Sequence, residues 1–278
     1  MKQLILSCIA LAVAYVPALA HDPDEPLTPR YLSDAPQIDG DLSDWENVPF
    51  IEVTPQNGVF DGESGDTDSP ADFSFSFAVA NDDRYLYVAV RIVDDILVLD
   101  TNPDPDELHT RAWMDDAVEI FIDGDHNHAP HARDSAKVEF KTGGEFSVVA
   151  NGAVTSDQSG VPGRGNDPEA WTSAGSYGAD GPAYAAPWDT TAGGFQIEAR
   201  LNYNIMGDDV GPGSRIGFTI SAHDDDDGGD RDVALYWKGF DQSAWRDEGG
   251  WGDLILADPS TAIEPESLGG VKGSAGSK

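Results

Sequence analysis

Two tryptophans stand where loops are expected to give way to strands. Trp113 lies near the start of segment 112–121, and Trp245 lies near the start of segment 243–254. An indole combines a large apolar face with one N–H donor, a surface that suits the C–H face of a sugar ring. Loops commonly carry binding residues on a rigid scaffold. These residues indicate a ring-shaped ligand, with burial in the core as the alternative interpretation.

Acidic residues are dense in segment 223–232, which reads His-Asp-Asp-Asp-Asp-Gly-Gly-Asp-Arg-Asp. Calcium takes about six to eight oxygen ligands from carboxylates and carbonyls, and a glycine pair allows the backbone to turn around an ion. We therefore expect structural calcium held by Asp224, Asp226 and Asp230. A solvated acidic loop is the alternative.

Histidines suggest a second kind of metal chemistry. Three of the six histidines, His126, His128 and His131, fall within seven residues, and imidazoles close together can bind Zn²⁺, Cu²⁺ or Ni²⁺. His21 becomes the first residue if cleavage follows Ala20, and an N-terminal histidine can chelate copper. Ordinary surface histidines are the alternative.

The first residues carry the signature of export. A basic start, an apolar stretch and the small residues Ala18-Leu19-Ala20 predict a secretory signal peptide over residues 1–20. Its apolar stretch is shorter than the ~20 residues of a membrane span. The single cysteine, Cys8, lies inside it. We expect a secreted protein, periplasmic or extracellular, that has neither a disulfide nor a membrane span.

The formal net charge is −35. Nucleic-acid binding requires a basic patch, so nucleic acid is not an expected partner, and an anionic membrane is disfavoured for the same reason. Such charge repels itself in a compact chain, and salt or divalent cations relieve that repulsion. The composition therefore favours a saline or calcium-containing medium.

Hydrophobic residues alternate with polar ones along most of the chain, which is typical of half-buried antiparallel strands. Many short strands separated by Gly-, Asp- and Pro-rich turns predict an all-β protein, an antiparallel two-sheet β-sandwich of the immunoglobulin or jelly-roll kind. Residues 80–84 are expected to form a hairpin turn, and residues 202–206 a short helical turn. The alternating segments are 72–79, 85–92, 118–123, 137–141, 195–201, 215–221 and 254–256.

The chain is expected to form one domain. An extended N-terminal segment, residues 21–30, precedes the sandwich of residues 31–258, and a Gly- and Ser-rich tail, residues 259–278, follows it. The Gly-, Pro- and Ser-rich residues 152–194 are expected to be a long loop insertion at the rim of a binding face, with a poorly ordered crossover as the alternative.

Six short sequence motifs follow one another in a fixed order along the chain. The first has Ile38-Asp39-Gly40 followed by Trp45, and the last has Trp245-Arg246-Asp247 followed by Gly252-Asp253-Leu254. Together they resemble the family 9 carbohydrate-binding modules, within the wider DOMON-like group of sugar- and haem-binding sandwiches. The four segments between them are 82–90, 113–123, 194–199 and 216–224.

The resemblance implies a binding site as well as a fold. In the sugar-binding members two tryptophans clamp the terminal sugars of a polysaccharide, and the resemblance gives these roles to Trp113 and Trp245. It makes Glu119 a hydroxyl-binding residue. The polar half of the site departs from the family, because Glu139 and Lys141 stand where an Arg-x-Asn pair is expected and His223 stands where Asn is expected. The candidate hydroxyl-binding residues are Glu119, Glu139, Lys141, His223 and Arg246.

Catalysis has little support. No nucleophile-elbow motif is present, and no carboxylate pair stands out as the ~5–9.5 Å pair of a glycosidase. We expect a secreted, non-catalytic protein that binds the end of an oligo- or polysaccharide and acts alone or beside a separate glycoside hydrolase. The alternative is an exported metal- or haem-binding protein on the same scaffold, although Met114 and Met206 form no paired axial signature.

Overall fold

A computed structural model describes residues 26–61, 67, 69–98, 112–128, 143–149, 154–155, 171–177, 188–189, 193–240 and 243–261. Within these ranges the elements are short strands and 3-10 turns, and they include no helix with the length and apolarity needed to cross a membrane. The expected signal peptide lies outside the described residues, as do residues 21–25 and most of the C-terminal tail. So do His21, His131, Glu139 and Lys141.

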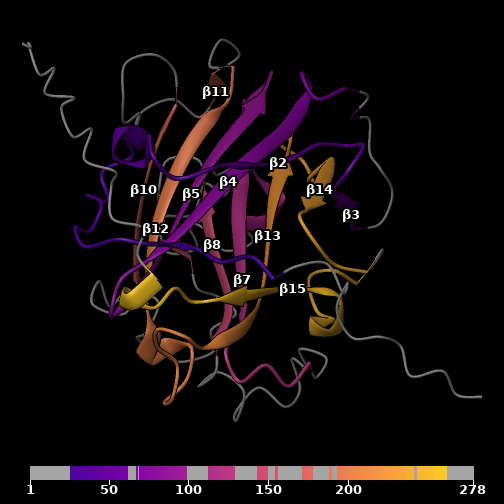
Figure 1. Ribbon diagram of the computed structural model, residues 1–278. Helices are drawn as coiled ribbons and strands as arrows, with labels where there is room; N and C mark the ends of the chain where they lie inside the picture. Colours follow the sequence, from indigo (N-terminus) through magenta and orange to yellow (C-terminus); the bar gives the residue numbers. More distant parts are fainter. Residues whose placement is uncertain are drawn as a thin grey trace, which may run out of the picture.

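One layer is a six-stranded sheet in the order β1-β4-β5-β12-β10, with β2 added at β4 (Figure 1). All its pairs are antiparallel except β1 with β4. The turn expected at 80–84 is confirmed, because β4 ends at Asn81 and β5 begins at Tyr85. The strands are β1 (Arg30–Tyr31), β2 (Ile51–Val53), β4 (Phe73–Asn81), β5 (Tyr85–Asp94), β10 (Trp171–Tyr177) and β12 (Phe195–Asn202).

The other layer is a seven-stranded sheet in the order β3-β14-β13-β7-β8-β9, with β15 paired to β13. A separate two-stranded pair joins β6 (Leu97–Val98) to β11 (Trp188–Asp189). The two layers confirm the predicted all-β sandwich. The strands of the second sheet are β3 (Val59–Phe60), β7 (Ala117–Asp123), β8 (Gly143–Val149), β9 (Val154–Thr155), β13 (Arg215–Asp224), β14 (Val233–Tyr236) and β15 (Gly252–Ile255).

The main core lies between the sheets and follows from the two-residue period of strands. On β7, Val118, Ile120 and Ile122 belong to this core and are at most 1% exposed. Successive side chains of a strand point to opposite faces, so Glu119 and Phe121 face outward. Phe121 belongs instead to a smaller outer core with Tyr236, Ala244 and Trp251, among others. The connection from β14 to β15 therefore covers part of this outer face.

The expected long loop, residues 152–194, contains strands. β10 pairs with β12 along its whole length, from Trp171↔Leu201 to Tyr177↔Phe195. Between its terminal aromatics β10 reads Thr-Ser-Ala-Gly-Ser, which lacks hydrophobic alternation and so gave no sequence signal for a strand. Pairing with a neighbour outweighs weak intrinsic β-propensity. The helical turn expected at 202–206 is present as η4 (Tyr203–Ile205).

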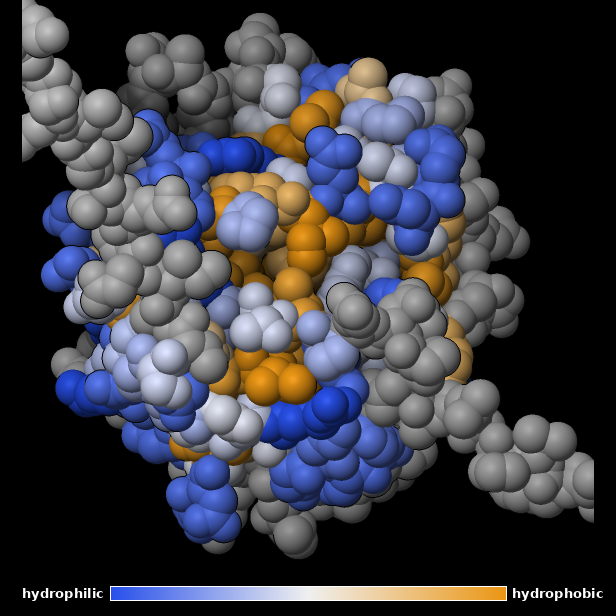
Figure 2. Space-filling model, viewed as in Figure 1, coloured by the Kyte–Doolittle hydropathy of each residue, from blue (hydrophilic) through white to orange (hydrophobic). Residues whose placement is uncertain are grey.

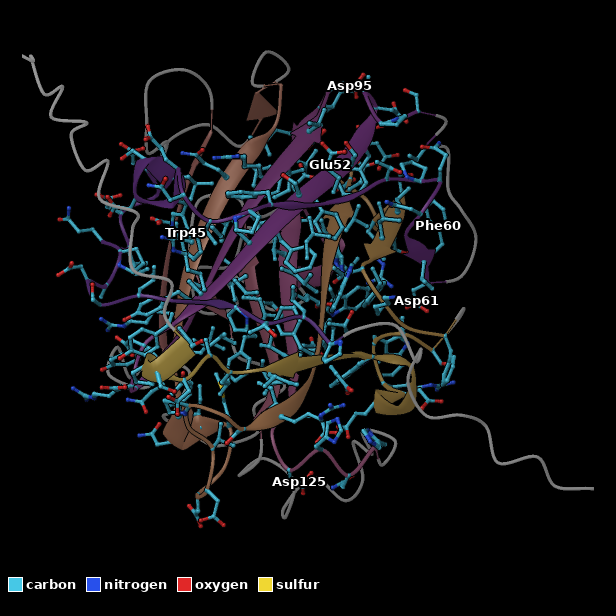
Figure 3. The ribbon with its side chains drawn as sticks, viewed as in Figure 1. Trp45, Glu52, Phe60, Asp61, Asp95 and Asp125 are labelled. Atoms are coloured by element: carbon cyan, nitrogen blue, oxygen red, sulfur yellow. The ribbon has the colours of Figure 1, made fainter. Side chains whose placement is uncertain are left out.

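The part of the chain between β1 and β2 crosses the outer face of the six-stranded sheet (Figure 1). Its 3-10 turn η1 (Leu42–Trp45) buries Trp45, whose Nε1 donates to Glu198 Oε1 at 2.7 Å, and Gly40 N donates to Glu198 Oε2 at 2.9 Å. Trp45 is labelled in Figure 3. Figure 2 shows hydrophobic residues gathered in the middle of this face, with hydrophilic residues around them. The opening motif therefore has a structural role on the face opposite to the site described next.

Candidate functional site

A pocket of about 260 Å³ opens on the outer side of the seven-stranded sheet, lined by Trp113, Glu119, Glu145, Arg231 and Trp245. Three of these residues are ones that the sequence singled out. Trp113 and Glu119 are six residues apart, whereas Trp245 lies more than a hundred residues later, and the fold brings all three together.

The two tryptophans approach the pocket from neighbouring connections. Trp113 sits on the 3-10 turn η2 (Ala112–Met114), immediately before β7. Trp245 lies on the connection from β14 to β15, against the smaller outer core. Both side chains are part-exposed, unlike the fully buried Trp45 and Trp251. Part of each indole surface is therefore accessible to a ligand in the pocket.

An arginine side chain lies over the ring of each of these two indoles. The guanidinium carbon of Arg231 lies 5.3 Å from the Trp113 ring centroid, and that of Arg246 lies 5.2 Å from the Trp245 centroid. Cations are attracted to the negative face of an indole. Arg231 lines the pocket, whereas Arg246 is exposed beside Trp245.

Glu119 lines the pocket and is 3% exposed. On β7 it pairs with Ser147 of β8 and Ser221 of β13. Ser147 Oγ donates to Glu119 Oε1 at 3.3 Å, and His223 Nε2 lies 3.2 Å from Glu119 Oε2. Burial works to raise the pKa of Glu119. The neighbouring His223, with hydrogen bonds from His223 and Glu145, holds it below its ordinary value. The pocket therefore contains an ionised carboxylate.

His223 stands behind the pocket wall. It is 0% exposed, and its Nδ1 donates to the Trp113 backbone oxygen at 2.9 Å. His223 is a candidate hydroxyl-binding residue on the sequence, but its burial places it against Glu119 and the turn of Trp113 instead. One imidazole thus connects the indole-bearing turn to the carboxylate.

Sequence reasoning missed Glu145 and Arg231. The strand that follows β7 was expected at 137–141, which put Glu139 and Lys141 forward, whereas the described strand β8 presents Glu145 and Ser147 on the same outer face. Arg231 was hidden in the acidic segment assigned to calcium. Its Nη2 lies 3.2 Å from Asp61 Oδ2, and Asp61 follows β3 (Figure 3). The Glu-x-Ser spacing of β8 was the signal that could have found Glu145.

The expected calcium ligands separate in space. Oxygens of Asp94, Asp116 and Asp224 lie within 4.8 Å of one another, as do those of Asp94, Asp95 and Asp226. Asp230 is exposed and belongs to neither group. Asp224 and Asp226 therefore each lie among other carboxylates, and their role as calcium ligands stays a prediction. Their companions lie over a hundred residues earlier, beyond the reach of a local motif.

The ionised form of the carboxyl groups in this cluster is disfavoured, because they are buried and lie close to one another. Burial, reinforced by neighbouring acids, raises the pKa of Asp94 to about 7 and that of Asp224 to about 9. Within the described part of the chain, the buried Asp94 Oδ2 and Asp226 Oδ1 have no hydrogen-bond partner. Buried polar atoms are normally satisfied, so these oxygens fit a bound cation.

The cluster is connected to the pocket through the backbone. Asp116 comes three residues after Trp113, and its Oδ1 accepts a hydrogen bond from Asp225 N at 3.1 Å. Its other oxygen accepts from Val98 N. Asp116 thereby ties the start of β7 to the loop that carries Arg231.

The histidine segment lies elsewhere. His126 Nε2 is 2.7 Å from Asp253 Oδ1, and the rings of His126 and His128 are 4.2 Å apart. Figure 3 shows Asp125, at the start of this segment, and Asp95, in the carboxylate cluster, at opposite ends of the molecule. Met206, considered above as a haem ligand, is fully buried in the main core.

Comparison with known proteins identifies the family of this chain and supports its fold. Residues 38–259 match the family described as carbohydrate family 9 binding domain-like. The chain belongs to this family. It is a binding module of the all-β sandwich type, rather than an enzyme. The resemblance drawn from six short segments is confirmed over most of the sandwich.

Relatives agree with this assignment. The chain is 27% identical over 222 residues to endo-1,4-beta-xylanase A of Thermotoga maritima, a match that covers 80% of this chain and 17% of the xylanase. The chain thus spans less than a fifth of that relative. Two structures of a family 9 module from Caldicellulosiruptor kristjanssonii, in complex with cellotriose and with glucose, share the fold. Their TM-scores are 0.57 and 0.56, each at 19% identity over 87% of this chain and 100% of theirs.

Proposed function

We propose that this protein is a secreted carbohydrate-binding protein that holds the end of an oligo- or polysaccharide chain between Trp113 and Trp245. The observation that carries the proposal is the shared pocket, because the two part-exposed indoles, far apart in sequence, line it together with Glu119, Glu145 and Arg231. The apolar C–H faces of a sugar suit the indoles.

The polar lining suits the other part of a sugar. Carboxylate oxygens accept hydrogen bonds from hydroxyl groups, and a guanidinium donates several in a fixed fork. Charge-assisted hydrogen bonds of this kind are stronger than neutral ones. Pockets for drug-sized ligands run from about 300 to 1,000 Å³. A pocket of about 260 Å³ is smaller, which favours the end of a glycan over a long internal stretch.

The relatives support a glycan ligand. A family 9 module of the same fold is known in complex with cellotriose and with glucose, and the sequence relative is an endo-1,4-beta-xylanase. The expected signal peptide supports action outside the cytoplasm, with a separate glycoside hydrolase as a natural companion. These relationships favour β-1,4-linked plant polysaccharides as the first ligands to test.

Calorimetric titration tests this proposal. Cellotriose and xylotriose are titrated into the wild-type protein, Trp113→Ala and Trp245→Ala. Aromatic stacking on a ring is worth about 1–3 kcal/mol, so each variant should lose about 5- to 150-fold in affinity. Phe240→Ala is the control, since Phe240 is 40% exposed on the connection that carries Trp245 yet does not line the pocket. Undiminished binding by both tryptophan variants would refute the clamp.

We also propose calcium as a structural ligand of the carboxylate cluster. Asp94, Asp116 and Asp224 would hold it, with Asp95 and Asp226 close by. Their all-oxygen donor set suits Ca²⁺, and the buried Asp94 oxygen that has no described hydrogen-bond partner fits it. When bound, calcium supplies positive charge among the carboxylates. Metal analysis of the purified protein and of Asp224→Asn tests this, and the variant should lose about one equivalent of calcium.

A further inference from the structure

The carboxylate cluster and the pocket are built from the same two segments of the chain. Asp116, in the cluster, comes three residues after Trp113 of the pocket wall. Asp224, also in the cluster, comes seven residues before Arg231, which lines the pocket as well. The third acid of the cluster, Asp94, ends β5 of the other sheet. A change at the cluster therefore reaches two walls of the pocket through short stretches of backbone.

Hydrogen bonds fix the first stretch, from Trp113 to Asp116. One carboxylate oxygen of Asp116 accepts from Asp225 N at 3.1 Å, and the other accepts from Val98 N. Asp116 N in turn donates to Val98 O at 3.1 Å. His223 Nδ1 donates to the Trp113 backbone oxygen at 2.9 Å. The turn that carries Trp113 is thus held by Asp116 on one side and by His223 on the other.

The second stretch, from Asp224 to Arg231, belongs to a loop that is closed on itself. Asp232 N donates to the Asp224 backbone oxygen at 2.8 Å, and Asp226 N donates to Asp232 Oδ2 at 3.0 Å. Arg231 stands directly before Asp232, and its guanidinium carbon lies 5.3 Å from the Trp113 ring centroid. Since Asp224 is a cluster residue, its position determines where this loop presents Arg231 to the pocket.

The cluster needs positive charge to keep this arrangement. Asp94, Asp116 and Asp224 are 2%, 0% and 5% exposed, and one oxygen from each lies within 4.8 Å of the others. In the described part of the chain, the buried Asp94 Oδ2 has no hydrogen-bond partner. Ionised carboxylates at such distances repel one another, whereas a cation among them attracts all three. A bound cation therefore holds three segments together, and two of these segments carry walls of the pocket.

We propose that the affinity of the pocket for a glycan depends on calcium at the carboxylate cluster. With calcium bound, Asp116 keeps Trp113 in its place in the pocket wall. Asp224 does the same for Arg231. The inference rests on the proposed function, its calcium site included, and adds the regulation of that site: a glycan is held where calcium is available and released where calcium is scarce. By thermodynamic linkage, the glycan raises the affinity for calcium by the same factor.

Calorimetric titrations at constant pH test this coupling. Cellotriose is titrated into the wild-type protein in excess calcium and in excess chelator, and calcium is titrated with and without saturating cellotriose. Coupling between two sites is commonly about 5- to 150-fold, so cellotriose should bind at least about tenfold more weakly without calcium. The affinity for calcium should rise by an equal factor when cellotriose is bound.

Two arginine variants separate this coupling from a general need for calcium in folding. Arg231→Ala removes the link between the loop and the pocket, so the effect of calcium on cellotriose affinity should fall below about threefold. Arg84→Ala is the matched control, because the exposed Arg84 also lies over an aromatic ring, 5.1 Å from the Tyr85 centroid, in the turn between β4 and β5. It should keep the full factor. If calcium only kept the chain folded, both variants would keep the full factor, and that result would overturn the inference.

The inference and the glycan-binding proposal fail on different results. Equal cellotriose affinity with and without calcium would overturn the inference and leave glycan binding in place. A purified protein that holds no calcium after dialysis against it would do the same. If neither cellotriose nor xylotriose binds in either condition, both proposals are wrong.

Discussion

Removing the imidazole of His223 should lower the free energy of unfolding by more than the loss of so small a side chain suggests. His223 is fully buried and contacts two elements of the site, the Trp113 backbone oxygen at 2.9 Å and Glu119 at 3.2 Å. In His223→Ala, the buried carboxylate of Glu119 loses its main cationic neighbour. Breaking a buried pair by removing one partner costs about 3–5 kcal/mol, because a charge is left uncompensated.

The remaining contacts of Glu119 place the expected loss at the lower end of that range. Ser147 and Glu145 continue to hydrogen-bond it. We therefore expect His223→Ala to lower the free energy of unfolding by about 3 kcal/mol. Urea denaturation measures this value, provided that the slope against urea stays the same.

A double-mutant cycle shows whether the loss arises from charge. In the Glu119→Gln background no carboxylate charge is left unpaired, so His223→Ala should cost clearly less there, with a coupling energy above about 1 kcal/mol. A single-variant cost below about 1 kcal/mol would refute the reasoning, as would an equal cost in both backgrounds. Binding gives an independent readout: freeing the turn of Trp113 should weaken glycan affinity even where His223→Ala remains folded.

Other predictions concern the carboxylate cluster, the pocket rim and the N-terminal motif. Without metal, thermal stability should fall as pH rises from about 6 to 9, because folded Asp94 and Asp224 keep protons, with pKa values of about 7 and 9, that the unfolded chain releases near 3.8. Melts with calcium should show a smaller fall, and an identical pH profile with and without calcium would contradict the proposed site. Arg231→Ala should weaken glycan binding in calorimetry while the melting temperature changes little, and unchanged affinity would remove Arg231 from the site. Trp45→Phe should cost about 1–3 kcal/mol in urea denaturation, because Glu198 loses the indole donor, and a neutral result would contradict the structural role of this motif.

Much of the fold could be predicted from the sequence because strand burial has a strict period of two. Val118 and Ile120 face the main core, and Glu119 between them faces the pocket, as alternation requires. β10 could not be predicted from the sequence, because most of its residues are small and show no hydrophobic alternation. Its position depends on pairing with β12.

The site residues that lie in local sequence motifs could be predicted, whereas those placed by strand pairing or by a distant loop could not. Trp113 and Trp245 belong to recognisable segments, and both line the pocket. Glu145 lies at the pocket because of the register of β8 against β7, which the sequence does not reveal. Arg231 lies in a loop whose acidic composition predicts only a metal site. Asp94 joins Asp224 through a contact between strands of different sheets, which no spacing in the chain reveals.

The central claim is that a glycan contacts Trp113 and Trp245 together. Incorporation of 5-fluorotryptophan gives each of the seven tryptophans its own ¹⁹F resonance, which Trp→Phe variants assign. On titration with a bound oligosaccharide, the resonances of Trp113 and Trp245 should shift together along one binding curve, while those of the buried Trp45 and Trp251 stay in place. Saturable binding that leaves either Trp113 or Trp245 unshifted would contradict the account.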